Sequence, residues 1–249
     1  MPHFYVPPEN IRGSYFWLNR QESEHVARVL RKQPGEEIQL FDGADRSFRG
    51  VLETVTPSKV DGRVVAEEKQ ETSRYRLRLF QVLPKGDKME WILEKGTELG
   101  VHEFVPVNSE RSVGRVPAER LPARLERWEK IIRSAAQQCG RTDLPRVQTP
   151  LDWNAALARI EPDQWTFLPW ESAAGTTLKA GLEAFRRERA AALPVINVII
   201  GPEGGLSPDE VARAEARGAR TVTLGPRILR TETAGLAAAA AFLYELGND

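Results

Sequence analysis

Two glycine-containing segments of this chain have the clearest potential for chemistry. The first, Gly201-Pro202-Glu203-Gly204-Gly205, directly follows the apolar run Val195–Ile200. Glycines at the end of a strand let the backbone approach a ligand and expose its amides. Ser207, Pro208 and Glu210 then predict a helix that begins with a capping box. The segment is therefore either a ligand-binding loop or a tight, well-capped connection, and it matches neither the dinucleotide fingerprint nor the P-loop.

The second segment covers residues 224–234 and reads Leu-Gly-Pro-Arg-Ile-Leu-Arg-Thr-Glu-Thr-Ala. Thr231 is the expected N-cap of a final helix. The middle of that helix, residues 237–241, consists of five alanines. A helix that is small and apolar nearly all round is buried on several sides, so it is expected in a core or in a subunit interface.

The charge of the chain is balanced overall and uneven along its length. The 249 residues are 41% hydrophobic and 28% charged, as in ordinary globular proteins. The 35 basic and 35 acidic residues speak against a protein that binds nucleic acid through bulk positive charge. Residues 74–160, however, hold 16 basic and 11 acidic residues, whereas both flanking segments are slightly acidic. This basic stretch either docks an anionic partner or is a solvated helix face.

Several protein classes are excluded. The single cysteine, Cys139, cannot form an intramolecular disulfide and suits a reducing compartment, and we expect it as a buried thiol on an apolar helix face. His3, His25 and His102 lack the spacing of metal ligands, so we expect no metal. The first eleven residues lack the features of a secretory signal, and no apolar run is long enough to span a bilayer. The chain is therefore predicted to be cytoplasmic.

The periodicity of the chain changes after residue 73. Residues 37–67 form short alternating runs separated by Asp42-Gly43 and Pro57-Ser58, which predicts an all-β module in residues 1–73. In residues 74–249, strand patterns alternate with helix patterns. The predicted strands are 77–83, 103–107, 165–168, 195–200 and 221–224, and the predicted helices are 88–99, 118–138, 152–159, 208–217 and 233–246. This alternation predicts an α/β fold with a mostly parallel sheet, whose ligands lie beyond the carboxyl ends of the strands.

The long helix at 118–138 has two distinct faces. Its apolar face contains Leu121, Leu125, Trp128, Ile132 and Ala135. A stripe of arginines lies beside that face, and further arginines and amides follow near the helix end. Such side chains suit phosphates and base edges. Together with two earlier arginines, the predicted RNA-binding residues are Arg28, Arg31, Arg120, Arg124, Arg127, Arg133, Gln138 and Arg141.

The two glycine-containing segments and three further strings resemble the bacterial 16S rRNA (uracil-1498 N3) methyltransferase family. The strings are His25-Val26-Ala27-Arg28-Val29-Leu30-Arg31, Lys95-Gly96-Thr97-Glu98-Leu99-Gly100 and Ser134-Ala135-Ala136-Gln137-Gln138-Cys139-Gly140-Arg141. The resemblance implies an N-terminal PUA-like β-barrel and a C-terminal SPOUT domain, trefoil-knotted, with helices on both faces of its sheet. It also implies a homodimer that uses S-adenosylmethionine to methylate 16S rRNA of the 30S subunit.

The same resemblance implies a set of site residues. Uracil N3 attacks only after losing its proton, and we hypothesise that Arg230 stabilises the developing uridinate oxygen. Glu232 is a candidate proton acceptor, and the alternative for Arg230 is a pair with a carboxylate. Methylation of tRNA and a non-catalytic RNA-binding module are the alternative functions. The implied cofactor-binding residues are Leu168, Pro169, Gly201, Pro202, Glu203, Gly204, Gly205, Leu224, Gly225, Ile228, Leu229 and Arg230.

Overall fold

The computed structural model describes residues 3–68, 73–173, 175–188 and 193–247, and the chain divides into two compact units. The first unit contains Met1–Thr72 and Arg133–Leu144, and the second contains Ser73–Ile132 and Pro145–Asp249. Arg133–Leu144 therefore belongs to the first unit, whereas the predicted boundary after residue 73 places this segment in the second domain. The reason is that residues near the end of the long helix pack on the first unit, where Gln137 donates a hydrogen bond to Glu22 over 3.1 Å.

The first unit is built on a six-stranded curled sheet. Its core contains Phe4, Phe16, Leu40 and Val60, all at most 1% exposed. The strand pairs are antiparallel except for β1 with β4. The strands predicted between residues 37 and 67 are confirmed. In spatial order the strands are β1 (His3–Tyr5), β4 (Glu37–Phe41), β5 (Ser47–Thr56), β6 (Lys59–Glu68), β3 (Tyr15–Trp17) and β2 (Ile11–Arg12).

The first unit is not all-β, which corrects the prediction. A short helix α1 (Arg20–Glu24) continues into a π-helical turn (His25–Val29), and a 3-10 turn covers Pro8–Asn10. Asn19 caps α1, because its side chain accepts a hydrogen bond from the amide of Glu22 over 2.9 Å. Such short turns leave little periodicity in the sequence, and here they are stabilised by burial of Ser23 and Val26 against the sheet.

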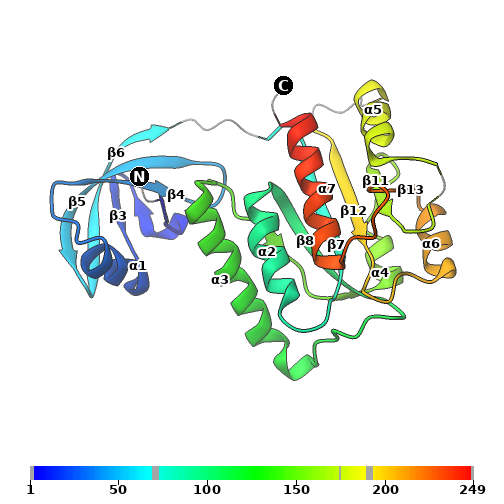
Figure 1. Cartoon of the computed structure of the whole chain (residues 1–249). Helices are drawn as coiled ribbons and strands as arrows, with labels where there is room; N and C mark the ends of the chain where they lie inside the picture. Colours follow the sequence, from blue (N-terminus) through cyan, green and yellow to red (C-terminus); the bar gives the residue numbers. More distant parts are fainter. Residues whose placement is uncertain (1–2, 69–72, 174, 189–192, 248–249) are drawn as a thin grey trace. The chain divides into compact units, whose positions relative to one another are not determined.

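The second unit contains a seven-stranded sheet in which all pairs are parallel (Figure 1). This confirms the predicted α/β architecture. The predicted strand at 221–224 lies two residues earlier, because the backbone of Thr223 pairs with Thr177 and no longer with β11, and its hydroxyl bonds to the backbone of Gly225. The spatial order is β10 (Leu151–Asp152), β8 (Val101–Asn108), β7 (Arg76–Val82), β12 (Val195–Ile200), β11 (Trp165–Pro169) and β13 (Ala219–Val222), with β9 (Arg146–Val147) beside β8.

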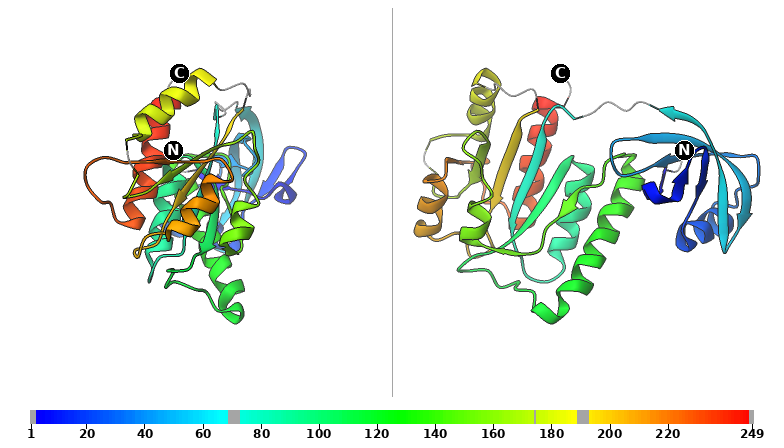
Figure 2. Two further views of the ribbon diagram at one scale, coloured as in Figure 1. Left: turned by 90° about the vertical axis from the view of Figure 1, so that its right-hand side faces the viewer. Right: turned by 180° about the vertical axis from the view of Figure 1, so that it is seen from behind.

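Helices cover both faces of this sheet (Figures 1 and 2). One face packs against α2 (Lys88–Glu98), α3 (Leu121–Cys139, after a 3-10 turn at Ala118–Arg120), α5 (Leu178–Glu188) and α7 (Thr231–Leu246). The other face packs against α4 (Trp153–Leu157) and α6 (Pro208–Glu215). The prediction missed α5, and α7 begins two residues before its predicted start.

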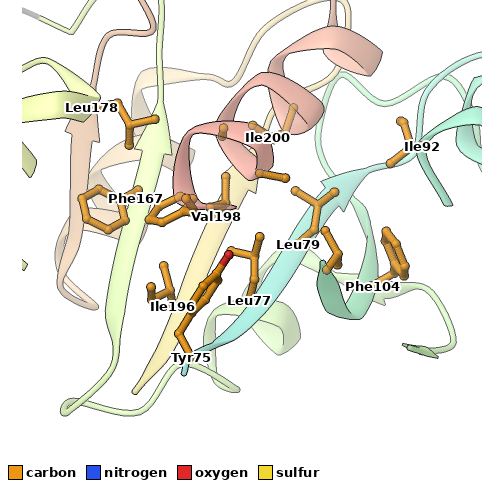
Figure 3. Packing of buried hydrophobic residues seen from close by; sticks show 14 of the residues in the cluster. Tyr75, Leu77, Leu79, Ile92, Phe104, Phe167, Leu178, Ile196, Val198 and Ile200 are labelled. Carbon is orange, nitrogen blue, oxygen red and sulfur yellow. The ribbon is translucent and has the colours of Figure 1, made fainter. Parts of the chain in front are cut away.

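The central strands are apolar on both faces because both faces are covered. Leu79 and Val198 point toward α7 in the larger core (Figure 3), whereas Phe80 and Ile199 belong to the core on the opposite face. The neighbouring positions of one strand therefore serve two different cores. Since the strands are parallel, their carboxyl ends share one edge of the sheet, and the loops there lead to α2, α6 and α7.

Candidate functional site

A cavity of about 520 Å³ lies at the carboxyl ends of β11 and β12. Three segments that are distant in sequence form most of its wall, and Lys88 and Ala234 complete it. The segments are Pro169–Glu171 after β11, residues 200–206 at the end of β12, and residues 228–231 before and at the start of α7. The two glycine-containing segments identified in the sequence therefore meet in one cavity, as expected for a parallel sheet.

The glycine loop after β12 is held by hydrogen bonds within the loop and at the start of α6. The amide of Gly205 donates to the carbonyl of Pro202 over 3.0 Å, and Gly205 has a φ of 69°, which favours glycine. The predicted capping box is confirmed: Ser207 accepts from the amide of Glu210 over 3.3 Å, and Glu210 accepts from the amide of Ser207 over 3.0 Å. The loop is thus both a tight connection and a wall of the cavity, so the two interpretations do not exclude each other.

The segment between β13 and α7 also lines a second, smaller cavity of about 150 Å³. Leu224 and Gly225 contribute to this smaller cavity, while Ile228 and Leu229 line both. Thr231 is not the N-cap of α7, which corrects the prediction: Arg230 holds that position, and Thr231 is the first residue of the helix. The Thr231 hydroxyl is used elsewhere, because it donates to the carbonyl of Gly201 over 2.6 Å.

Lys88, at the start of α2, joins two of the cavity segments electrostatically. Its ammonium group lies 2.8 Å from a carboxylate oxygen of Glu203 and 3.2 Å from one of Glu232. The hydrogen bonds that the ammonium donates to these carboxylates raise the pKa of Lys88. Burial acts to raise the pKa of Glu203, but the hydrogen bonds from Lys88 and from backbone amides outweigh it and hold that pKa below its usual range. Glu203 is therefore ionised at neutral pH.

Of the two predicted catalytic residues, Arg230 and Glu232, only the first lines the cavity. Arg230 lines it and is exposed, and no carboxylate pairs with this guanidinium among the residues that the structure describes. The alternative of a carboxylate partner for Arg230 thus has no support in this part of the chain. Glu232 is not among the lining residues; its side chain is only 16% exposed and pairs with Lys88, which does line the cavity.

The predicted cofactor-binding residues take three positions. Pro169, the residues of the glycine loop from Gly201 to Gly205, and Ile228, Leu229 and Arg230 line the larger cavity. Leu224 and Gly225 line only the smaller one. Leu168 lines neither of these cavities, because it is fully buried in the core against α4 and α6.

The predicted RNA-binding residues divide between the two units, and several already have partners. In the second unit, Arg124 and Arg127 both pair with Glu90, over 3.2 and 2.5 Å, whereas Arg120 is exposed. The arginine stripe is therefore partly neutralised by α2, which leaves fewer charges for a polyanion than the sequence suggests.

In the first unit, three of the predicted arginines interact with neighbouring side chains. Arg28 pairs with Glu24 over 2.9 Å, Arg141 forms two 2.7 Å hydrogen bonds to Asp143, and Arg133 stacks over the ring of Tyr5. Arg31 and Gln138 are exposed, and Arg31 has the unusual φ of 52°.

Other sequence expectations can be compared with the structure. Cys139 is exposed, not buried as predicted: it follows Trp128, Ile132 and Ala135 on the same face of α3, but it is the last residue of the helix. Within the described ranges, no group of three or more histidine, cysteine or acidic side chains could hold a metal ion. No helix among the described residues has the length and hydropathy needed to cross a membrane.

Sequence reasoning missed several residues of the cavity, among them Lys88, Trp170 and Glu171. For Lys88 a signal was available: it begins the helix that follows the carboxyl end of a buried strand, where polar residues often face a ligand. Trp170 and Glu171 follow β11 in the same way, but a tryptophan next to a glutamate is not a pattern with a specific chemical meaning.

Family models match both parts of the chain. The model described as RNA methyltransferase domain matches residues 71–243, and the model described as RNA methyltransferase PUA domain matches residues 18–65. The first alone spans more than half of the chain. The matched ranges correspond closely to the β-rich and α/β parts described above.

Relatives and solved structures agree with these models. The chain is 34% identical over 235 residues, 92% of its length and 90% of the relative's, to ribosomal RNA small subunit methyltransferase E of Bacillus subtilis. The corresponding structure from Neisseria gonorrhoeae, bound to S-adenosyl methionine, is 32% identical with a TM-score of 0.84 and covers 98% of this chain and 97% of that one. A methyltransferase structure from Legionella pneumophila, in complex with the same cofactor, is 29% identical with a TM-score of 0.84 and the same coverage. The resemblance seen in the sequence is confirmed, and the chain belongs to the RNA methyltransferase family that includes ribosomal RNA small subunit methyltransferase E, with an α/β RNA methyltransferase domain and an N-terminal PUA-like domain.

Proposed function

We propose that this chain transfers a methyl group from S-adenosylmethionine to N3 of a uridine in 16S rRNA, at the position that the family methylates. The observation that carries the proposal is the cavity at the carboxyl edge of the parallel sheet, where the glycine loop and the segment before α7 meet. Family membership supports the substrate class, since relatives with similarity over nearly the whole chain are named for small-subunit ribosomal RNA.

The cavity fits the cofactor in size and in character. Its volume of about 520 Å³ lies within the range of roughly 300–1,000 Å³ that is usual for small-molecule sites. Ile200, Leu206, Ile228, Leu229 and Ala234 supply apolar walls. The charges of the lining residues balance, with Glu171 and Glu203 against Lys88 and Arg230. Carboxylates in the wall of the cavity suit a cofactor that carries a sulfonium charge.

In this proposal the glycine loop and the segment before α7 hold the cofactor through backbone groups and apolar contacts. When bound, S-adenosylmethionine supplies an electrophilic methyl group and leaves as a neutral thioether. The chain then has to hold the two reactants in line, which accounts for a site made mainly of positioned backbone. Pro169 and residues 201–205 would form one wall, and residues 224–230 the other.

Arg230 is the proposed catalytic residue. A guanidinium at the rim of the cavity donates hydrogen bonds to a uracil oxygen, which favours the deprotonated imide that reacts at N3. Glu232 fits the role of proton acceptor less well, because its carboxylate is paired with Lys88 and mostly buried. We therefore assign Glu232 a role in organising the site. In this proposal the proton of uracil N3 passes to solvent water or to an acceptor group of the RNA.

We also propose that the first unit and the exposed arginines of the second contact RNA, and that the protein works as a homodimer in the cytoplasm, where ribosomal subunits are made. The exposed side chains of Leu243 (40%) and Tyr244 (75%) near the end of α7 support a subunit interface on this helix. Light scattering over a concentration series tests the dimer, and a monomer at every concentration would refute it.

The decisive experiment uses 30S particles that lack the modification. The protein is incubated with these particles and methyl-labelled cofactor, and the modified base is mapped and identified. We expect label at N3 of one uridine in 16S rRNA and none in a parallel reaction with bulk tRNA. Label on another base would contradict the proposed chemistry, and label on tRNA alone would favour the tRNA alternative.

A further inference from the structure

A buried amide in the second unit is connected to the cavity through one hydroxyl group. Gln81, near the end of β7, is 0% exposed, and its Nε2 donates to the carbonyl of Val82 and to the hydroxyl of Thr231, both over 2.9 Å. The Thr231 hydroxyl in turn lies 2.6 Å from the carbonyl oxygen of Gly201. Three segments are therefore joined: β7, the glycine loop after β12, and the start of α7.

The directions of these hydrogen bonds follow from chemistry. A carbonyl oxygen only accepts, so the atom of Gln81 that faces Val82 has to be the amide nitrogen. The Thr231 oxygen accepts from that nitrogen, and its single proton is then directed to Gly201. The relay runs in one direction, from Gln81 through Thr231 to Gly201, and a group that cannot donate at its start would change the bond at its end.

The relay ends on the wall of the cavity, although it begins in the core. Gly201 and Thr231 line the cavity, and Gln81 does not. Gln81 is paired in register with Ile200, the residue before Gly201. Helix α7 also approaches closely here, since a Cβ at Gly235 would lie 3.4 Å from the side-chain oxygen of Gln81. Any change of the amide is therefore transmitted to both cavity walls.

We propose that Gln81 is a positioning residue for the cofactor cavity, and that it acts through Thr231 by fixing the carbonyl of Gly201 and the first turn of α7. The inference rests on the proposed function, because it takes S-adenosylmethionine as the ligand of this cavity. Its physical basis is that a fully buried amide at Gln81 and a partly buried carbonyl at Gly201 both lose free energy without their partners, so without the relay the glycine loop turns toward another donor and loses its binding conformation.

The same domain offers a matched control. Asn197, in β12, is also 0% exposed, and its amide donates to the Thr166 hydroxyl over 3.1 Å and to Gln164 over 3.1 Å. This second buried amide–threonine pair lies toward the amino end of the strands, and none of its residues lines the cavities described here. Removing the hydroxyl of Thr166 should lower the stability of the fold without changing the cofactor site.

The test compares Thr231→Val, Thr231→Ser, Gln81→Glu and Thr166→Val with the wild type. Valine has nearly the shape of threonine but lacks the hydroxyl, serine keeps the hydroxyl, and an ionised glutamate cannot donate. For each folded variant, calorimetry gives the Kd for S-adenosylmethionine and thermal unfolding gives the Tm. We expect the Kd to rise about tenfold or more for Thr231→Val and for Gln81→Glu.

We expect the Kd to stay near the wild-type value for Thr231→Ser and for Thr166→Val, even though Thr166→Val lowers the Tm. A wild-type Kd for Thr231→Val, or an equal loss of affinity for Thr166→Val, would overturn the positioning role. If Gln81→Glu fails to fold because it buries a charge, the threonine variants decide the question. A wild-type protein that does not bind the cofactor would instead refute the proposed function, so the two failures are distinguishable.

Discussion

The two edges of the parallel sheet in the second unit carry similar polar residues with different consequences. Toward the amino ends of the strands, Glu103 accepts from Arg78, Arg159 and Gln148 over 2.8, 3.0 and 2.7 Å. Toward the carboxyl ends, Lys88 pairs with two carboxylates beside a cavity of about 520 Å³. The charges of the first network pair with one another, whereas the second network presents charges and backbone groups to the cavity.

This difference shows that residue type alone does not define the site. Both edges have buried amides, threonines and ion pairs, and both networks join several strands. Only at the carboxyl edge do the loops run on to the starts of helices and leave room between them. Changes at the carboxyl edge should therefore affect ligand binding and turnover, while changes at the amino edge should affect stability.

The largest effect is expected for Arg230→Ala. Loss of a donor that stabilises a developing oxyanion typically lowers kcat by about 10²–10³-fold, and we expect a loss of at least about a hundredfold at saturating cofactor. Methyl transfer to unmodified 30S particles measures it. The control is Arg217→Ala, which removes an exposed arginine after α6 that lines neither cavity. Wild-type turnover for Arg230→Ala would refute the catalytic assignment.

A substitution at the amino edge should have the opposite profile. Glu103→Gln removes the charge shared by Arg78 and Arg159, and we expect the free energy of unfolding to fall by about 2 kcal/mol, as for other hydrogen bonds to charged groups. Urea denaturation measures this loss. The Kd for the cofactor should not change. A clear rise in Kd would contradict the claim that the amino edge affects stability alone.

Lys88→Met tests the electrostatic role of the carboxyl edge. The pKa of Glu203 lies below its usual range, so the stabilisation by this pair is present above pH 4.5 and is lost as pH falls through the folded-state pKa. We expect Lys88→Met to weaken cofactor binding severalfold at pH 7, because Glu203 loses the partner that fixes its position in the glycine loop, and we expect the stability difference from wild type to vanish in acid. Lys95→Met, which removes another lysine of α2 bridging two glutamates, is the matched control and should leave the Kd unchanged.

The smallest effect is expected on the surface of α3. If Arg120, Arg124 and Arg127 each contacted a phosphate, their joint replacement by alanine would lower the salt slope of RNA binding by nearly three. Because Glu90 already pairs with two of them, we expect a decrease of about one. RNA binding measured at salt concentrations from roughly 50 to 200 mM distinguishes a decrease in slope of three from a decrease of one. An unchanged slope would show that the arginine stripe is a solvated face.

Much of the second unit was predictable because its signals are local. The apolar run of β12, the capping box at Ser207 and the helical periodicity of α2 and α3 each arise within a few neighbouring residues. The turns that the prediction missed, α1 and the π-helical turn after it, depend on packing against the sheet of the first unit. The N-cap at Thr231 was wrong for a similar reason, since the hydroxyl finds a better partner in Gly201, 30 residues away.

The sequence by itself determined the α/β class, the two glycine-containing segments and, through its resemblance to a family, the reaction and cofactor. Tertiary structure alone decided which side chains meet: Lys88 with Glu203 and Glu232, Gln81 with Thr231, and Arg124 and Arg127 with Glu90. The physical reason is that strand and helix patterns depend on near neighbours along the chain. A hydrogen bond or an ion pair across a sheet edge depends on distances set by the packing of the whole domain.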